Sequence, residues 1–388
     1  MGLVYLDYNA STPLDPGVLA CMWPILERTY GNPSSIHGAG REARAVIDSA
    51  RDTLARLLEA QPHEIIFTGG GTEADNLAVI GLARQHVLKH PGHRRHLVTA
   101  LTEHHAVLHA AEFLEKREGF HITWLPVDGQ GIVDLEVLER ELTEETALVS
   151  VMSANNETGT LQPIGEIARL CRKKGVLFHS DMIQSFGKLP VTTRDSDEAP
   201  GPDAISIAAH KFYGPKGVGV LWLRSGISID PIAYGGQHEN SRRPGTENVA
   251  GIAGLARAAE LVHAGMAEEQ ARQGRLCERL WEGIQAAYPK AVRNGHPVHR
   301  LANTLNVSFP GLEGEGLIIN FDIEGIAVSS GSACMVGSIT PSHVLLAMGV
   351  PLKQAQATVR FSVGKGTTEE EIEKVVARLP KIIDRLSL

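Results

Sequence analysis

The sequence lacks the features of several large protein classes. No run of about 18 apolar residues occurs, so we expect no transmembrane helix. The N-terminus carries no basic segment followed by an apolar one, which argues against a signal or transit peptide. The four cysteines lie far apart and form no Cys-x-x-Cys pair, so neither a disulfide framework nor a structural zinc site is expected.

Composition narrows the class further. The 388 residues include 37 Lys and Arg against 45 Asp and Glu, and this net charge of −8 disfavours generic binding to nucleic acid or anionic membranes. Hydrophobic residues make up 43% and charged residues 21%, which is ordinary for a globular chain of one large or two medium domains. We therefore expect a globular protein of the cytoplasm.

From residue 40 to about 225, helical patterns alternate with short apolar runs rich in β-branched residues. The pattern predicts helices at 41–59, 72–90 and 106–118 and strands at 64–68, 96–100, 121–126, 146–152, 175–180, 203–208 and 217–223. Such alternation favours βαβ units and a parallel sheet covered on both faces. Ligands of these sheets bind at the carboxyl ends of the strands.

Residues 246–288 are mostly helical in pattern, and a second mixed segment follows. Its expected elements are strands at 304–309, 326–329 and 357–363 and helices at 314–321, 341–348 and 368–386. We expect a large domain at 15–255 and a smaller α+β domain at 256–388 joined by residues 1–14.

The segment Thr68-Gly-Gly-Gly-Thr-Glu73 follows a predicted strand and opens a predicted helix. Glycines there let backbone amides approach an anion, and a helix N-terminus favours negative charge. The spacing Gly69-x-Gly71-x-x-Ala74 resembles a dinucleotide fingerprint, but the acidic residue expected about 20 positions later is missing. A phosphate site without a nucleotide is therefore favoured, with a simple glycine turn as the alternative.

Lys211 and Asp181 each follow a predicted strand. Desolvated lysines readily form Schiff bases with carbonyl compounds, although a surface-loop lysine is the alternative for Lys211. An aspartate near a phosphate site and a lysine is typical of a pyridoxal phosphate (PLP) site, where it keeps the pyridine nitrogen protonated. A helix N-cap is the alternative for Asp181.

Motifs along nearly the whole chain resemble those of the cysteine desulfurases of the NifS/IscS type, within the class V aminotransferase-like PLP enzymes. They include Gly-Asn-Pro-Ser-Ser at 31–35, Thr-Glu-His-His-Ala-Val at 102–107, Asn-Asn-Glu-Thr-Gly at 155–159, Arg-Pro-Gly-Thr-Glu-Asn at 243–248 and Ser-Ser-Gly-Ser-Ala-Cys at 329–334. The resemblance implies an α/β PLP-dependent transferase fold (aspartate aminotransferase-like, fold type I). The large domain would bind PLP, and the small domain would carry the catalytic cysteine loop.

The same resemblance implies roles around the cofactor ring. Lys211 would carry the PLP aldehyde, and Asp181 would pair with the pyridine nitrogen. Gln184 would bind the phenolic oxygen, and His104 would stack on the ring and move protons. Considered alone, His104 would be a packed or surface histidine.

The phosphate and the substrate have implied partners of their own. The phosphate would be held by Gly71, Thr72, His210 and, from the partner subunit of a homodimer, Thr246. Asn155 and Arg360 would bind the substrate carboxylate, because a planar guanidinium matches a carboxylate. Considered alone, Arg360 would be a surface salt-bridge partner.

Cys334 lies in a Ser/Gly/Ala-rich loop after a predicted strand. A desulfurase needs a thiolate that attacks the substrate sulfur and holds it as a persulfide, and the resemblance assigns this role to Cys334. The length of segment 334–343 is similar to the long loop of the NifS/IscS group and not to the compact loop of the SufS group. Cys21, Cys171 and Cys277 lie in helical patterns and are expected to be packing residues.

No resident metal is expected, although Cys334 could ligate a nascent cluster shared with a scaffold protein. The histidines at 90, 93 and 96 lie in a turn rich in Pro, Gly and Arg, so a solvated loop is favoured over a metal site.

Three departures from the family pattern modify these expectations. Ala208 replaces a common serine two positions before His210, so one phosphate hydroxyl is missing and weaker PLP retention is predicted. Met182 and Ile183 predict bulkier packing near the ring. The chain ends at Leu388 without an IscS-type tail, so scaffold docking through such a tail is not expected.

The leading hypothesis is a PLP-dependent desulfurase that converts L-cysteine to L-alanine and passes sulfur to an acceptor. Acceptors compatible with the sequence are an iron–sulfur scaffold, a tRNA-thiolating enzyme, DNA phosphorothioation machinery and free reductant, and direct binding to nucleic acid or membrane is not expected. The alternatives are a selenocysteine lyase, whose sequences are similar, and a PLP-fold sulfur carrier without turnover.

Overall fold

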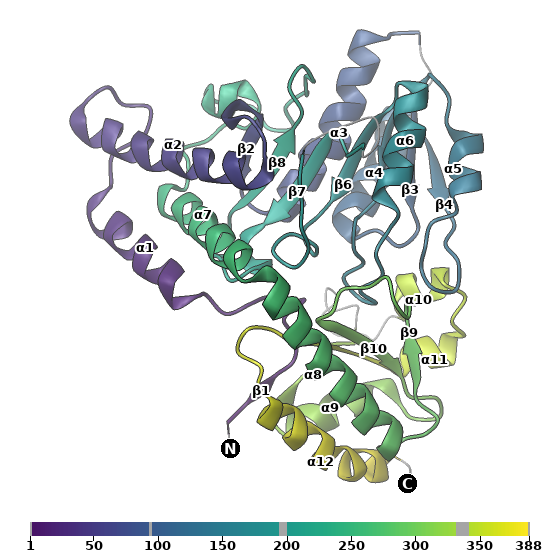
Figure 1. Ribbon diagram of the computed structural model, residues 1–388. Coiled ribbons are helices and arrows are strands. Elements are labelled where there is room, and N and C mark those ends of the chain that lie inside the picture. Colours follow the sequence, from purple (N-terminus) through teal and green to yellow (C-terminus); the bar gives the residue numbers. More distant parts are fainter. Residues whose placement is uncertain (1, 93–94, 194–199, 331–340, 387–388) are drawn as a thin grey trace.

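The structure is a computed structural model that describes residues 2–92, 95–193, 200–330 and 341–386 (Figure 1). Its upper part is built on a seven-stranded sheet with strand order β2-β8-β7-β6-β5-β3-β4. The strands are β2 (Ile65–Thr68), β3 (His96–Ala100), β4 (His121–Leu125), β5 (Thr146–Ser150), β6 (Leu177–Asp181), β7 (Ala204–Ala208) and β8 (Gly219–Leu223).

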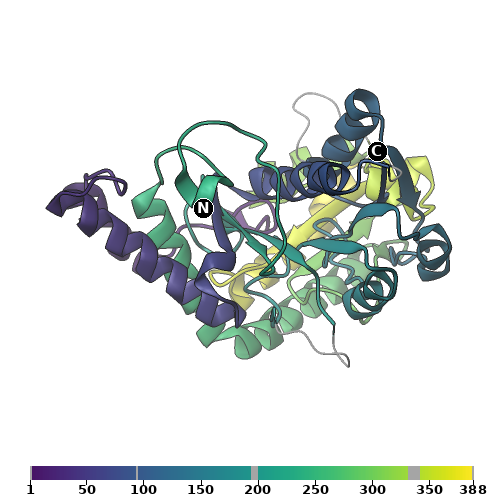
Figure 2. The same cartoon turned by 90° about the horizontal axis from the view of Figure 1, so that it is seen from above.

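Helices cover both faces of this sheet, as the continuous apolar strands predict (Figure 2). Leu97 of β3 packs in one apolar cluster with α3 (Gly71–Lys89) and α4 (His105–Glu118). The next residue, Val98, packs in another cluster with α5 (Leu135–Glu141) and α6 (Ile164–Lys174). Because successive side chains of a strand point to opposite faces, the two clusters lie on opposite sides of the sheet.

The sheet is mainly parallel, as predicted, but β8 is an exception. It runs antiparallel to both of its neighbours, β2 and β7. Only residues 209–218 separate β7 from β8, which is too short for a crossover helix, so the chain turns directly back. That short return contains Lys211 and therefore places it at the edge of the sheet where β7 ends.

Long helices surround and extend this unit. Helices α1 (Pro16–Arg28) and α2 (Gly38–Leu58) extend to one side of the sheet, and α1 contains Cys21, for which the sequence indicates a helical pattern (Figure 1). Helices α7 (Val249–Ala264) and α8 (Met266–Ala287) lead to the lower part of the molecule. Short 3-10 turns lie at Pro62–Glu64, Ala209–Lys211 and His238–Ser241.

The lower part contains a three-stranded antiparallel sheet with order β12-β10-β9. Its strands are β9 (Val292–Asn294), β10 (Thr304–Ser308) and β12 (Thr358–Ser362), and its helices are α9 (Gly314–Ile323), α10 (His343–Ala347), α11 (Leu352–Gln356) and α12 (Glu369–Leu386). Strand β1 (Val4–Tyr5) pairs with β11 (Ile326–Ala327), so the N-terminal segment joins this part.

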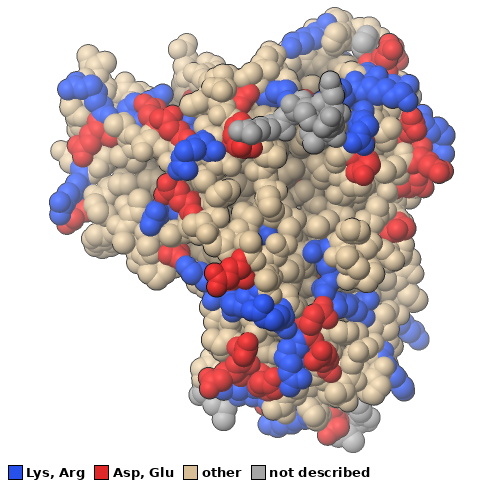
Figure 3. All heavy atoms as spheres, viewed as in Figure 1, with Lys and Arg blue, Asp and Glu red and all other residues tan. Residues whose placement is uncertain are grey.

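Two separate apolar cores correspond to these two parts. Ile252 and Leu255 of α7 belong to the core under the large sheet, whereas Leu276 and Leu280 of α8 belong to the lower core. The boundary at residue 255 stays a prediction. In the described part of the chain, every helix is too short or too polar to cross a lipid bilayer. Lys and Arg are interspersed with Asp and Glu on the face in Figure 3.

His96 contradicts the expectation of a solvated histidine loop. It is the first residue of β3 and only 1% exposed, and its ring nitrogens lie 3.0 Å from Thr146 Oγ1 and 2.9 Å from Thr123 Oγ1. Cross-strand threonines satisfy the ring, so His96 is a packed residue of the sheet.

Candidate active site

Asp181 and Lys211 lie at the same edge of the large sheet. Asp181 is the last residue of β6 and pairs with Ser206 of β7, and Lys211 follows β7 directly. Burial raises the pKa of the Asp181 carboxyl to about 6, while the Ile183 N–H at 2.8 Å and the positive charge of Lys211 act in the opposite direction. The two groups are therefore close enough to interact electrostatically.

The N-terminal segment supplies acceptors for the lysine. Lys211 Nζ donates to the carbonyl oxygens of Asn9 at 2.7 Å and Ala10 at 2.9 Å. Gln184 Nε2 donates to the same Asn9 oxygen at 2.9 Å. Sequence reasoning missed these acceptors because every residue carries a carbonyl oxygen. The segment Tyr-Leu-Asp-Tyr-Asn-Ala at 5–10, which also resembles the family pattern, is the signal that could have pointed to them.

His104 caps the N-terminus of α4. Its Nδ1 accepts the Ala106 N–H at 3.1 Å, so a neutral ring carries its proton on Nε2. Burial, followed by the charges of Lys211 and His105, lowers the pKa of His104 to about 4. The ring is therefore neutral at pH 7 and can stack or donate from Nε2.

The predicted phosphate site is the N-terminus of α3. Gly70 has a φ of 146°, which favours glycine, and no described side chain caps this helix. A Cβ at Gly71 would lie 2.3 Å from Ile183 Cδ1 and 3.2 Å from Ala208 Cβ, so any side chain at this position would displace Ile183. The uncapped backbone N–H groups of the first turn can therefore donate hydrogen bonds to an anion.

The remaining predicted phosphate residues have different surroundings. Thr72 is exposed and lines an open cavity of about 560 Å³ together with His104. Burial and the charge of Lys211 lower the pKa of His210 to about 4, so its ring is neutral. Thr246 is also exposed but lines a different cavity, of about 720 Å³, beside Glu247.

The two predicted carboxylate ligands of the substrate are both engaged within the protein. Arg360, only 3% exposed, donates from Nη2 to Asp7 Oδ1 at 2.8 Å and from Nη1 to the Asn156 oxygen at 3.0 Å. Its buried Nε has no hydrogen-bond partner among the described residues. Asn155 donates to the Thr102 oxygen at 3.0 Å and shapes the turn that follows it. Arg360 thus has a donor to offer, whereas the amide of Asn155 is committed to the turn.

Cys334 lies outside the described residues, and the other three cysteines differ among themselves. Cys171 and Cys277 are buried, as predicted, and burial raises the pKa of each thiol, to about 12 for Cys277. Both therefore stay protonated and are poor nucleophiles. Cys21 of α1 is partly exposed, so it is less completely packed than predicted.

These residues fit PLP on chemical grounds. The cofactor carries a phosphate, a basic pyridine nitrogen and an aldehyde. The uncapped start of α3 at Gly71, the buried carboxylate of Asp181 and the amine of Lys211 match these three groups.

Three polar groups near this site were missed in the sequence. Lys188 donates to Gln184 Oε1 at 3.0 Å. Asp75 and Glu103 are fully buried acids whose pKa is affected by the charge of Asp181. Asp75 lies in a helical pattern and Glu103 in a loop, and neither pattern indicates that the acid is buried.

Comparison with known proteins gives matches over nearly the full chain. The family model "Aminotransferase class-V" matches residues 4–375. A protein named cysteine desulfurase IscS from Clostridium botulinum (strain Hall) is 45% identical over 382 residues, which are 98% of this chain and 94% of that protein. The protein of the same name from Dictyoglomus turgidum is 45% identical over 383 residues, covering 99% of this chain and 95% of that protein.

The solved structures agree with this result. A structure titled "NIFS-LIKE PROTEIN" superposes with a TM-score of 0.91 at 38% identity, covering 99% of this chain and all of that one. This match confirms the predicted PLP-dependent transferase fold. With a full-length family match and relatives at 45% identity, the chain belongs to the aminotransferase class-V family, in its cysteine desulfurase branch.

Proposed function

We propose that this protein is a PLP-dependent cysteine desulfurase that converts L-cysteine to L-alanine and transfers the sulfur to Cys334 as a persulfide. The observation that carries this proposal is the convergence of Lys211 and Asp181 at one sheet edge, in a chain whose full-length relatives are named cysteine desulfurases. These relatives favour neither a selenocysteine lyase nor a sulfur carrier without turnover. The proposed role is sulfur supply for iron–sulfur clusters or other thio-cofactors.

The residues around the ring would divide the proton chemistry between them. When bound, PLP supplies an electron sink for the bonds to the substrate α- and β-carbons. With a pKa of about 6, Asp181 is mostly ionised at pH 7 and would hold the proton of the pyridine nitrogen. Lys211 Nζ, directed by the carbonyl oxygens of Asn9 and Ala10, would take the substrate α-proton. His104 would cover the ring as a neutral imidazole.

The other predicted residues would orient the two ends of the reactants. Gly71, Thr72 and His210 would bind the phosphate, next to Ala208, whose methyl group contributes only packing. Arg360, whose buried Nε lacks a hydrogen-bond partner among the described residues, would bind the substrate carboxylate. Asn155 would support that site by shaping its turn.

The sulfur step balances without an external oxidant. The Cys334 thiolate would attack the substrate sulfur and form an S–S bond while the C–S bond breaks. The bonding electron pair stays on the substrate carbon, which takes a proton and becomes the methyl group of alanine. Cys334 is left as a persulfide. An acceptor protein can reduce this persulfide or take over its outer sulfur.

We also propose a homodimer in which Thr246 reaches the phosphate of the partner subunit. The exposure of Thr246 supports this, and so do large apolar side chains left in water near α1 and α2. They are Trp23 at 63%, Tyr30 at 87% and Ile36 at 91% exposure. Such residues favour a covered interface. A cytoplasmic location stays a prediction.

Alanine release from L-cysteine tests the proposed function. We expect the PLP-bound protein to release alanine and the Cys334→Ala variant to lose this activity almost completely. Cys21→Ala, which removes the partly exposed thiol of α1, serves as the control and should keep the activity. Turnover of L-selenocysteine alone, persisting in Cys334→Ala, would replace the proposal with a lyase. No alanine from either substrate despite bound PLP would contradict it.

A further inference from the structure

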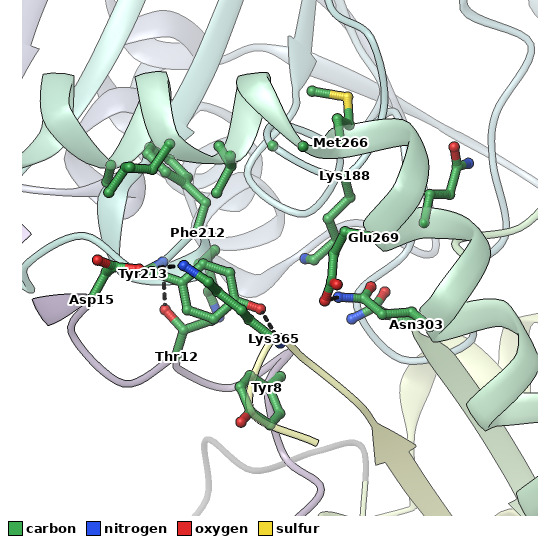
Figure 4. Close-up of a pocket in the computed structure, with 18 of the residues that line it drawn as sticks. Tyr8, Thr12, Asp15, Lys188, Phe212, Tyr213, Met266, Glu269, Asn303 and Lys365 are labelled. Carbon is green, nitrogen blue, oxygen red and sulfur yellow. Dashed lines mark hydrogen bonds and ion pairs between the residues drawn. The ribbon is translucent and has the colours of Figure 1, made fainter. Parts of the chain in front are cut away.

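Lys188 lies next to the candidate active site and lines the same cavity as Lys211. It is seven residues beyond Asp181, in the loop that follows β6. Its side chain lines a cavity of about 270 Å³ that also borders Lys211 and Asn303 (Figure 4). None of the roles assigned so far uses this lysine.

The ammonium group of Lys188 binds one residue at two points. Its Nζ donates to the Gln184 backbone oxygen at 2.9 Å and to Gln184 Oε1 at 3.0 Å. An ammonium can only donate, so it binds the oxygen end of the side-chain amide and not the nitrogen end. The contact therefore determines which way the Gln184 amide points.

The nitrogen end of that amide reaches the reacting lysine through one shared acceptor. Gln184 Nε2 donates to the Asn9 carbonyl oxygen at 2.9 Å, and Lys211 Nζ donates to the same oxygen at 2.7 Å. Lys188, Gln184, Asn9 and Lys211 thus form one connected network. If the amide of Gln184 rotated by 180°, its oxygen would face the Asn9 oxygen and the network would break.

The charge of Lys188 also acts on this network. Burial, with the charges of Lys211 and Arg360, lowers the pKa of Lys188 to about 7, and Lys188 contributes to the low pKa of His210. Lys188 therefore lies within electrostatic range of the groups that would bind the cofactor. Below about pH 7, where Lys188 is mostly charged, its positive charge opposes protonation of neighbouring groups.

We infer that Lys188 is a positioning residue of the active site: it orients the Gln184 amide so that Nε2 faces the cofactor, and its charge lowers the proton affinity of PLP bound at Lys211. This inference rests on the proposed function, because it takes Gln184 as the partner of the phenolic oxygen. The competing explanation is that Lys188 only stabilises its own loop.

The pH titration of the visible absorbance of bound PLP distinguishes the two explanations. Lys188→Met keeps the aliphatic stem but removes the ammonium. Both the lost charge and the freed amide favour protonation, so the midpoint should rise by roughly half a pH unit or more. Lys188→Arg, which keeps a cationic donor, should restore most of the original midpoint. Lys173→Met, an equal change of charge on the exposed face of α6, should leave the midpoint unchanged.

Gln184→Ala tests the same link from the other end and leaves Lys188 in place. We expect a midpoint shift in the same direction, and the double variant should shift by less than the sum of the single shifts, because the two residues act through one contact.

A lower melting temperature of Lys188→Met with the midpoint of the parent protein would overturn the inference. An unmoved midpoint in Gln184→Ala would also overturn it, even if Lys188→Met fails to fold. The absorbance does not depend on alanine release, so a shifted midpoint in a protein without desulfurase activity would reject the proposed function and keep the positioning role.

Discussion

Asp181 and Asp75 are both buried near the same end of the large sheet, and their surroundings differ. Asp181 accepts the Ile183 N–H at 2.8 Å and lies near the charge of Lys211. Neither carboxylate oxygen of Asp75 has a hydrogen-bond partner among the described residues. The nearby Ser206 hydroxyl, which lies 2.9 Å from His179 Nε2, acts to lower the pKa of Asp75. Burial, and next the charge of Asp181, raises the pKa of Asp75 well above its usual value.

The difference shows that burial alone does not make an acid useful to a cofactor. His179 lies 3.8 Å from Asp75 but cannot compensate its charge, because burial lowers the pKa of His179 to about 3. Burial therefore favours the neutral form of Asp75, whereas Asp181, with a pKa of about 6, is mostly charged at pH 7. Glu103 resembles Asp75, since burial raises its pKa and one of its oxygens also lacks a described partner. Glu103 also accepts a backbone N–H, that of Met152 at 2.7 Å, so the nearby cation Lys211 is what makes Asp181 the exception.

The largest expected effect is a difference in kcat between asparagine variants of Asp181 and Asp75. Asp181→Asn removes the charge that would hold the pyridine proton, and kcat for alanine release should fall about 10²–10³-fold. Asp75→Asn replaces an acid whose neutral form is favoured by burial with a neutral amide of the same shape, and kcat should stay within a few-fold of the parent value. Measurements of kcat at saturating PLP check both variants. Equal losses in the two variants would show that Asp75 is charged and would remove the distinction.

Asp7 extends the comparison to an acid that is paired with a cation at the substrate end. Asp7→Ala frees Arg360 Nη2 from its 2.8 Å contact. The guanidinium would no longer be held in one orientation, so kcat/KM for L-cysteine should fall about tenfold or more, mainly through KM. Asp48→Ala removes an exposed acid that pairs with Arg44 at 3.1 Å and is the matched control. A KM equal to that of the parent protein would exclude an orienting role for Asp7.

The stability of the protein without cofactor should depend on pH through Asp75. The folded protein binds the Asp75 proton more tightly than the unfolded chain, so this group's contribution is complete below about pH 4 and is lost as the pH rises toward the raised pKa. An asparagine at this position does not titrate, so the Asp75→Asn variant does not lose stability in this way. Its free energy of unfolding at pH 7 should exceed that of the parent by about 1 kcal/mol or more. Urea unfolding between pH 5 and 8 checks this, with the exposed change Asp48→Asn as control. A variant that is less stable at pH 7 would mean that Asp75 has a partner in solution.

The two aspartates also show how far a sequence can predict such a site. Asp181 and Lys211 were predictable because each follows an apolar strand, and the carboxyl ends of adjacent parallel strands meet at one edge. The direction of β8 was not predicted, since it depends on a turn too short for a crossover. Asp75 was missed because a single acid in a helical pattern is ordinarily exposed. Asn9 acts through its backbone, 202 residues from Lys211, and no side-chain pattern can reveal that contact.

The smallest expected effect concerns the phosphate end of the site, where Ala208 lies in place of a common serine. Its methyl group lies 3.2 Å from where a Cβ of Gly71 would be, close to the uncapped start of α3. Ala208→Ser would add one hydroxyl donor beside amides that already favour an anion, so PLP should dissociate a few-fold more slowly. Ala209→Ser, one residue further along, is the control, because the side chain of Ala209 packs in the apolar core under the sheet and gains nothing from a hydroxyl. Release of PLP into a trapping reagent gives the rate. An unchanged rate in Ala208→Ser would mean that the helix amides and His210 hold the phosphate without help from this position, and that the alanine is no handicap to retention.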